Sequence, residues 1–423
     1  MGTSAVIDEN TPSQRPLLSD MLKVTAPDYK PSAGTQQECF GRMTFDVVAP
    51  VEWPTFYNGD PEFLFYRAFS PKVADRGDEM TYGNTKIAVL GPADSTMLKK
   101  VLGRTPIATI KRLQESIAET HQYIAELKKA KSTRDSEIEL QTSAEKIQSW
   151  EGMIKEKQEN FESFDSGLPN SDGYWESSYE ANDKSNRYSI YRVYLMRNEK
   201  IYVFQSQQKL DKPTDKEMHK RAFISLLGKF RVRKANEVPT ELGVCLPHGF
   251  IADDGRTLSE FKQSLRWADA PGVVYTIETG NVHPRRMKST GMMAATKAAI
   301  GTPGSGGEED EVKDFVTKRI GPRSYKIGGL TGEQGGVILT VKRPGKEAYE
   351  AYSLFTGYSG WLGTAVLPYI TVDMHTYTKE QAPELKQNPP PFQHSMDRLD
   401  LMLKSMRLRP TSPPMPDFAN PPK

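Results

Sequence analysis

The sequence predicts an α+β fold of two related α/β-type domains, the first of which carries a long helical hairpin. Residues 189–205 alternate apolar and polar side chains around a short turn, and strand-like segments at 337–341 and 349–355 flank a turn at 343–346, which predicts an antiparallel β-hairpin in each half of the chain. A helix with one apolar face follows each hairpin, at 216–230 and 395–406. In 105–164 the apolar residues instead recur every three or four positions, which indicates helices.

The first half is expected to begin with β-strands. Strands are predicted at 39–48, 63–66 and 86–90, where apolar residues cluster between Pro, Gly and Asp turn residues. The polar, Pro- and Ser-rich residues 1–36 show no sustained periodicity. They are therefore predicted to form a flexible arm.

Two long helices are predicted within 105–164. Thr105 can cap the first helix, and Pro106 suits its first position because the N–H that proline lacks has no partner there. A polar stretch at 132–136 separates two apolar stripes, so we expect a helical hairpin. The first stripe is Ile110, Leu113, Ile117, Ile124 and Leu127, and the second is Ile147, Trp150, Ile154 and Phe161. The simpler interpretation is that the stripes pack on each other and on the nearby sheet, and the alternative is a docking arm.

The remaining segments complete two related halves. Residues 165–186 are rich in Ser, Asn, Asp and Gly and are predicted to form a surface loop. Strands at 244–251 and 273–277 open the second half. The ends of the two closing helices, 226–233 and 402–409, resemble each other in sequence, which favours two related units. The predicted divisions are a flexible arm 1–36, an N-terminal domain 37–238 with the helical insertion 105–164, a C-terminal domain 239–412 and a flexible tail 413–423.

Composition excludes some classes of partner. The chain has 56 basic and 54 acidic residues, and its net charge is +2. Because both signs are spread along the whole sequence, we expect no nucleic-acid partner. No apolar run approaches the roughly 20 residues that span a bilayer, so no integral membrane segment is expected. The opening residues lack the pattern of an export signal, so the chain is either cytosolic or a mature form whose signal was removed.

The two cysteines, Cys39 and Cys245, are far apart in the sequence. They fit either one structural disulfide in an oxidising compartment or two buried thiols in the cytosol. A zinc site is not expected, because neither cysteine has a second Cys or a His at ligand spacing.

No motif for catalysis or for a cofactor is found. The nearest match to a nucleophile elbow, 357–361, has Trp361 where the last glycine is required. The Gly-rich stretch 301–307 lacks the Lys and Ser/Thr of a phosphate loop, and acidic residues follow it. The six histidines are scattered, without metal-ligand spacing. We therefore expect a protein that is not an enzyme and that needs no cofactor or metal.

Four segments, in order along the chain, resemble the immunity proteins that neutralise lipase effectors of type VI secretion systems. The first is Cys39-Phe40-Gly41-Arg42, followed by Pro50-Val51-Glu52. The others are 243–251 (Gly-Val-Cys-Leu-Pro-His-Gly-Phe-Ile), 329–333 (Gly-Leu-Thr-Gly-Glu) and 367–374 (Leu-Pro-Tyr-Ile-Thr-Val-Asp-Met). The resemblance spans residues 39 to about 409, which is nearly all of the chain expected to be ordered.

This resemblance implies a periplasmic immunity protein whose two domains clamp and occlude a cognate lipase or phospholipase effector. It also favours a disulfide between Cys39 and Cys245, because each cysteine opens one half of the family pattern. A tight protein complex needs aromatic or Arg anchors. The aromatic residues predicted to serve as anchors are Tyr174, Trp175, Tyr358 and Trp361. The alternatives are an adaptor or chaperone that loads an effector, and a hydrolase of an unrecognised type.

Overall fold

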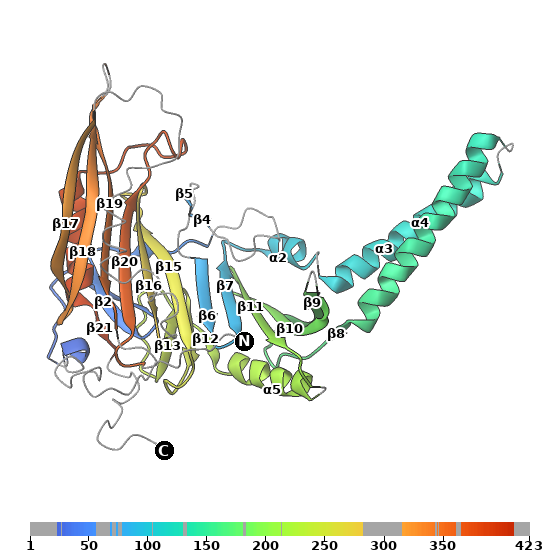
Figure 1. Cartoon of the computed structure of the whole chain (residues 1–423), viewed down its shortest axis with the longest axis horizontal. Helices are drawn as coiled ribbons and strands as arrows, with labels where there is room; N and C mark the ends of the chain where they lie inside the picture. Colours follow the sequence, from blue (N-terminus) through green and yellow to red (C-terminus); the bar gives the residue numbers. More distant parts are fainter. Residues whose placement is uncertain are drawn as a thin grey trace, which may run out of the picture. The chain divides into compact units, whose positions relative to one another are not determined.

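The computed structural model describes two compact units (Figure 1). The described residues are 23–26, 28–55, 68–69, 73–74, 78–103, 105–129, 133–180, 183–212, 214–281, 315–342, 345, 347–360 and 365–409. Unit 1 comprises Met1–Phe56, Phe65–Gly83 and Lys229–Lys423, and unit 2 comprises Tyr57–Leu64 and Asn84–Gly228. The α+β class is confirmed. The units do not follow the predicted division at 238, because the N-terminal strands belong to the same unit as the C-terminal half.

The main sheet of unit 1 is antiparallel, with the strand order β17-β18-β19-β20-β16-β15-β6. The short strand β3 (Val51–Glu52) pairs with β15. Strands β4 (Ala68–Phe69) and β5 (Val73–Ala74) form a separate two-stranded sheet. The main strands are β6 (Asp78–Tyr82), β15 (Ser259–Trp267), β16 (Val273–Gly280), β17 (Phe315–Ile327), β18 (Leu330–Val341), β19 (Tyr349–Tyr358) and β20 (Tyr369–Thr376). The hairpin predicted at 337–355 is confirmed as part of β18 and β19.

Helix α8 (Phe392–Ser405) packs against this sheet, close to the predicted bounds of 395–406. Its buried apolar side chains include Leu399 and Met402. Two tyrosines of the sheet bind its first turn. The hydroxyl of Tyr275 donates to the carbonyl of Ser395 at 3.0 Å, and the hydroxyls of Tyr352 and Ser395 lie 2.6 Å apart. The helix is therefore held by both apolar packing and buried hydrogen bonds.

Two small sheets connect the beginning and the end of the chain within unit 1. One has the order β1 (Gln36–Phe40), β2 (Met43–Val47) and β21 (Arg407–Leu408), and the other β12 (Phe230–Val232), β14 (Gly249–Ala252) and β13 (Gly243–Leu246). The single strands predicted at 39–48 and 244–251 are thus both hairpins. Part of the predicted flexible arm is also packed: Val24 is buried, and the Tyr29 hydroxyl donates to Asp46 Oδ2 at 2.5 Å.

Unit 2 contains an antiparallel sheet with the order β7-β11-β10-β9-β8, together with helices α2 (Ser95–Leu102) and α5 (Asp215–Leu227). The strands are β7 (Thr85–Leu90), β8 (Phe161–Ser163), β9 (Ser171–Glu180), β10 (Asp183–Arg197) and β11 (Lys200–Lys209). The strand predicted at 86–90 and the hairpin at 189–205 are confirmed. Asn198 and Glu199 form its turn, both with positive φ, as a two-residue hairpin turn requires.

The prediction of a surface loop at 165–186 is wrong, because β9 and the first residues of β10 make up most of this segment. Its Ser, Gly and Asp residues suggested a turn, but pairing with β10 on one side and β8 on the other supplies the backbone hydrogen bonds. The strand predicted at 63–66 lies outside the described residues.

The predicted helical hairpin is confirmed as α3 (Pro106–Leu127) and α4 (Arg134–Glu159). Thr105 accepts a hydrogen bond from the Ala108 N–H, as a capping residue does. The inward positions of α4, from Leu140 to Ile154, alternate three- and four-residue steps, as in a coiled coil. The two helices pack mainly on each other, and α4 also contacts β8. Phe161, predicted on the second stripe, lies in β8 instead.

Candidate partner-binding surface

A disulfide between Cys39 and Cys245 fixes the framework of unit 1. Cys39 lies on β1 and Cys245 on β13, with a sequence separation of 206 and a Cα–Cα distance of 5.8 Å. Both side chains are fully buried beside Phe250. The backbones of Gly41 and Cys245 also exchange two hydrogen bonds, of 2.8 and 2.7 Å. The pairing expected from the family resemblance is therefore present, and it ties the first strands of the chain to the segment near 245.

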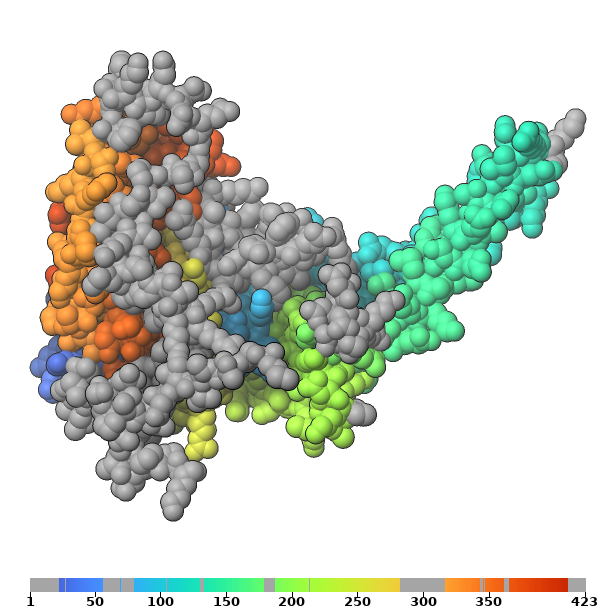
Figure 2. Space-filling model, viewed as in Figure 1, coloured from blue at the N-terminus to red at the C-terminus, as the bar shows by residue number. Residues whose placement is uncertain are grey.

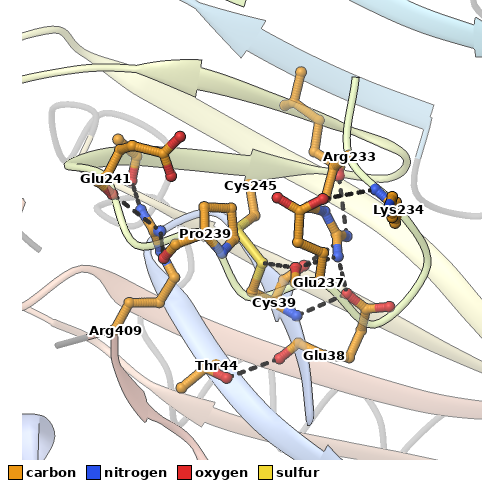
Figure 3. Close-up of a disulfide and its surroundings, with 12 residues drawn as sticks. Glu38, Cys39, Thr44, Arg233, Lys234, Glu237, Pro239, Glu241, Cys245 and Arg409 are labelled. Atoms are coloured by element: carbon orange, nitrogen blue, oxygen red, sulfur yellow. Dashed lines mark hydrogen bonds and ion pairs between the residues drawn. A yellow bond between two sulfur atoms is a disulfide. The ribbon is translucent and has the colours of Figure 1, made fainter. Parts of the chain in front are cut away.

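Arg233 is buried next to this disulfide (Figure 3). Its guanidinium lies 2.7 Å from Glu38 Oε1 and donates to the carbonyls of Cys39 and Leu246 at 3.3 and 3.2 Å. A buried charge is tolerated when it is paired and hydrogen-bonded in this way. The ion pair therefore holds β1 against the β12–β14–β13 sheet.

Arg409 makes a similar set of contacts at the end of the described chain (Figure 3). It donates to the carbonyls of Pro239, Glu241 and Gly243. Burial lowers the pKa of Arg409 to about 10, and the positive charge of nearby Arg42 adds to this effect. The guanidinium is still protonated at neutral pH, so it fixes the 239–243 loop through charge-assisted hydrogen bonds.

His219 is the one described histidine held between two serine hydroxyls. Its Nδ1 lies 3.0 Å from Ser189 Oγ and its Nε2 lies 2.9 Å from Ser206 Oγ. Burial lowers the pKa of His219 to about 4, so the ring is neutral at pH 7. Trp175 Nε1 also donates to Ser189 Oγ, at 2.8 Å. With 2% of its surface exposed, the ring holds α5 on the sheet and is shielded from any substrate.

The other described histidines do not gather at a common site. Among the described residues, no group of three or more His, Cys, Asp or Glu side chains is placed to hold a metal ion. None of the described helices is both long and apolar enough to cross a membrane. The remaining histidines are His121 on α3, His248 in the β13–β14 turn, His375 on β20, His394 on α8 and His283, which lies outside the described residues.

Tyr174 and Trp175, predicted as anchors for a partner, are instead core residues of unit 2. They are only 3% and 5% exposed. Adjacent residues point to opposite faces of β9, and both faces of the sheet are covered. On one face Lys216 Nζ lies 3.5 Å from the Trp175 ring centroid, and on the other Tyr174 stacks on Tyr194 at 6.2 Å and accepts a hydrogen bond from Arg192. Packing within the chain therefore accounts for both rings.

Tyr358, the third predicted anchor, borders an open hollow at one end of unit 1's sheet. The hollow has a volume of about 410 Å³. Its floor is bare because Gly332 lies so close to the Gly357 carbonyl that a Cβ at Gly332 would come within 2.2 Å of that oxygen. Trp361 lies outside the described residues. The hollow is lined by Pro322, Arg323, Ser324, Thr331, Gly332, Glu333, Gly357, Tyr358 and Ser359.

Two charged residues, Arg323 and Glu333, line the hollow, and the sequence alone did not point to either of them. Arg323 donates from Nε to Gln334 Oε1 at 3.0 Å, and Glu333 lies opposite Ser324 in the β17–β18 register. The strand register alone brings these residues to one place, so their spacing in the sequence gives no sign of a site. The repeated glycines at 332, 335 and 336 were the available signal, because glycine inside a strand often marks a close approach of backbone.

A second hollow lies in unit 2, at the base of the helical hairpin. Its volume is about 510 Å³, and it is lined by residues of α2, α3 and the β8–β9 region. Ile107, on the first turn of α3, is 52% exposed at its rim. Unit 2 therefore has an apolar hollow of its own. Tyr174, which is otherwise buried in the core, lines part of this hollow.

Comparison of the sequence with known families identifies the class of unit 1. Residues 237–411, all within unit 1, match the model described as "Tle cognate immunity protein 4 C-terminal domain". This segment is therefore similar to the C-terminal domain of that immunity-protein family, which confirms over these residues the resemblance inferred from the sequence. No curated protein sequence matches the chain significantly.

Solved structures of immunity proteins are similar to this chain over most of its length. The apo immunity protein TplEi of a type VI secretion system from Pseudomonas aeruginosa has 16% sequence identity and a TM-score of 0.46, covering 90% of this chain and 99% of TplEi. The structure of TplEi complexed with "L" peptide has 16% sequence identity and a TM-score of 0.44, covering 90% of this chain and 99% of TplEi. A chain of the Tle4–Tli4 complex has 15% sequence identity and a TM-score of 0.47, covering 90% of this chain and 100% of the matched chain.

Proposed function

We propose that this chain is an immunity protein that binds a cognate lipase effector of a type VI secretion system and occludes it, protecting the producing cell. The match of residues 237–411 to an immunity-protein domain carries this proposal. The family-like segment at Cys39, joined to that domain through the disulfide, supports it. The chain would act by binding alone, without a reaction of its own.

Occlusion needs an exposed surface with room for anchoring side chains. A stable protein complex buries on the order of 1,600 Å² in total, and a few well-packed residues supply most of the binding energy. The hollow beside Tyr358 could receive a side chain of the lipase, and Tyr358 itself is only partly buried. We therefore keep Tyr358 and Trp361 as proposed anchors. Tyr174 and Trp175 could reach a partner only if unit 2 opened its core.

We further propose that the protein works in the periplasm. A disulfide persists in an oxidising compartment, whereas cytosolic thiols are kept reduced. The Cys39–Cys245 bond lies in the interior of unit 1, where it contributes to the framework of the family domain. Fractionation of the producing cells, with the thiols alkylated before lysis, tests this. The oxidised chain should be found in the periplasmic fraction, and a reduced cytosolic chain would contradict the proposal.

The binding test uses the whole oxidised chain and the purified lipase encoded beside it. We expect calorimetry to give a Kd in the nanomolar range and the lipase to lose its activity on a phospholipid substrate at a one-to-one ratio. A lipase from an unrelated system serves as the control and should remain active. The absence of heat and of inhibition would reject the proposal.

The same experiment separates an inhibitor from a loading adaptor. An adaptor would bind the lipase with similar affinity but leave its activity intact. A hydrolase would release fatty acid from the substrate without any lipase present. The chain alone should show no such release.

A further inference from the structure

Strand β17 forms one edge of the main sheet of unit 1. It pairs with β18 on one side, and no other strand in the described part of the chain pairs with it. Figure 1 shows β17 at the margin of this sheet, and Figure 2 shows the orange residues of β17 and β18 at the surface. In an antiparallel edge strand, alternate residues direct their N–H and C=O groups away from the sheet. Such an edge can receive a further strand.

The edge strand is strongly basic. Among its 13 residues, Phe315–Ile327, there are four basic residues and no acidic residue. Lys318 and Arg319 are adjacent, so they place one positive charge on each face of the sheet. Their partners on β18 are Ile338 and Val337, which carry no charge. This part of the edge therefore carries positive charge that nothing on the neighbouring strand neutralises.

The first half of β17 is the better docking edge. The pairing with β18 shifts between Ile320 and Arg323, where Pro322 also removes a backbone donor. Beyond this point Tyr325 donates to Asp400 of α8, and Lys326 donates to Thr331. Before it, Val316 is 63% exposed, more than any other large hydrophobic side chain among the described residues. Residues 316–320 thus combine an apolar contact, positive charge and an unpaired edge.

The charges favour one kind of occupant. A second copy of β17 would bring four positive charges against four others, and like charges opposite each other destabilise a strand pair. Charged side chains on an edge strand guard against such self-pairing. The same charges attract an extended segment that carries Asp or Glu, since opposite charges across a strand pair are stabilising.

We propose that an acidic, extended segment of the lipase adds to unit 1 along residues 316–320 of β17 as a further strand. This inference rests on the proposed function, and it names the surface and the chemistry of the contact. Backbone hydrogen bonds supply the strand pairing, Lys318 and Arg319 select acidic side chains, and Val316 covers an apolar residue of the incoming strand. The hollow beside Tyr358 begins two residues further along β17, at Pro322, and is a separate contact.

The test compares the wild-type chain with the charge-reversal variant K318E/R319E. Calorimetry with the purified lipase should give a Kd at least about tenfold higher for the variant, because close charge pairs across an interface couple strongly. Overlapping 15-residue peptides of the lipase should include an acidic peptide that binds the wild-type chain and not the variant. The wild-type affinity should also fall with added salt, and this dependence should be weaker in the variant.

The matched control is K379E/K386E, which makes the same change in net charge at two exposed lysines elsewhere in unit 1. It should bind the lipase as the wild type does. Hydrogen exchange adds a second measurement, because it reports strand pairing and does not respond to attraction between charges alone. Lipase binding should slow exchange of the amides in 316–320, because a paired strand protects them.

The outcomes separate this inference from the proposed function. If the wild-type chain does not bind the lipase, both fail. If it binds, but K318E/R319E binds equally well and the amides of 316–320 are not protected, only the inference fails. The inference also fails if these amides are already protected in the free chain and become exposed when the acidic run Glu308–Glu311 is neutralised, because this chain would then occupy its own edge.

Discussion

The two units hold their outer helices in different ways. In unit 1, α8 has 14 residues and buries six of them, including Met396, Leu399 and Met402. In unit 2, α3 has 22 residues and buries only Pro106, while α4 has 26 and buries only Ser143 and Ile147. The apolar seam between α3 and α4 is otherwise only partly covered. Similar amphipathic patterns can therefore produce a core helix or a nearly free helical pair.

This contrast shows what stabilises each region. Helix α8 depends on tertiary packing and on the disulfide-linked framework of its unit. The helical hairpin depends on its end caps, on the short seam and on ion pairs such as Lys111–Glu115, whose side chains are both exposed. Exposed pairs of this kind contribute little. We therefore expect substitutions in unit 1 to cost more than equivalent ones in the hairpin.

The largest expected effect is the loss of the disulfide. The variant C39S/C245S should lower the free energy of unfolding of unit 1 by about 2–5 kcal/mol, because the open chain gains conformational freedom when it unfolds. Urea unfolding followed by hydrogen exchange measures both units at once. The amides of β1 and β13 should lose protection, while those of β10 in unit 2 should not. Equal stability of the oxidised wild type and the variant would contradict this account of unit 1.

A smaller effect is expected from truncating a single core side chain. Leu399→Ala should cost about 3 kcal/mol, because it leaves a cavity in a fully packed region. Ile117→Ala on α3 removes a side chain of similar size from the half-covered seam and should cost about 1 kcal/mol or less. Chemical unfolding of both variants measures the difference. Equal losses would mean that another part of the protein covers the hairpin seam.

The smallest effect is expected from acid, and it should arise in unit 2. The pKa of His219 is about 4 in the folded protein and about 6.5 when unfolded. Below pH 6.5 the unfolded state binds the proton more readily, so stability falls as the pH drops and levels off below pH 4. Between pH 7 and pH 5.5 the loss should be about 1 kcal/mol.

His219→Gln provides the control for this prediction, because an amide can still bond the two serine hydroxyls but does not titrate in this range. Urea unfolding at several pH values should show a flatter profile for the variant. If both profiles have the same slope, another group causes the acid sensitivity. Unit 1 should keep its exchange protection throughout this range, which would sharpen the contrast between the units.

Local patterns in the sequence were enough to predict most elements. The hairpin at 189–205, the helix at 395–406 and the start of α3 at Thr105 all depend on neighbouring residues, so periodicity and capping residues reveal them. The strand β9 escaped this reasoning. Its polar composition resembles a loop, and only its neighbours β8 and β10 make it a strand.

The candidate site was less predictable. The aromatic pair Tyr174 and Trp175 looked exposed because the surrounding residues are small and polar, whereas covering of both faces of β9 buries it. Tyr358 borders an open hollow, and its role as an anchor stays a prediction. The basic edge at Lys318 and Arg319 could not be found from sequence, because a strand becomes an edge only through the order of the strands in the sheet.

The sequence by itself determined the α+β class, the helical hairpin and the similarity of residues 237–411 to an immunity-protein domain, because each of these depends on local periodicity or on short motifs. Tertiary structure alone decided which N-terminal residues join unit 1, which aromatic rings are buried and which strand lies at the edge of the sheet. These features depend on contacts between residues such as Cys39 and Cys245, which are 206 positions apart. Long-range pairing is a property of the whole fold, and no local pattern specifies it.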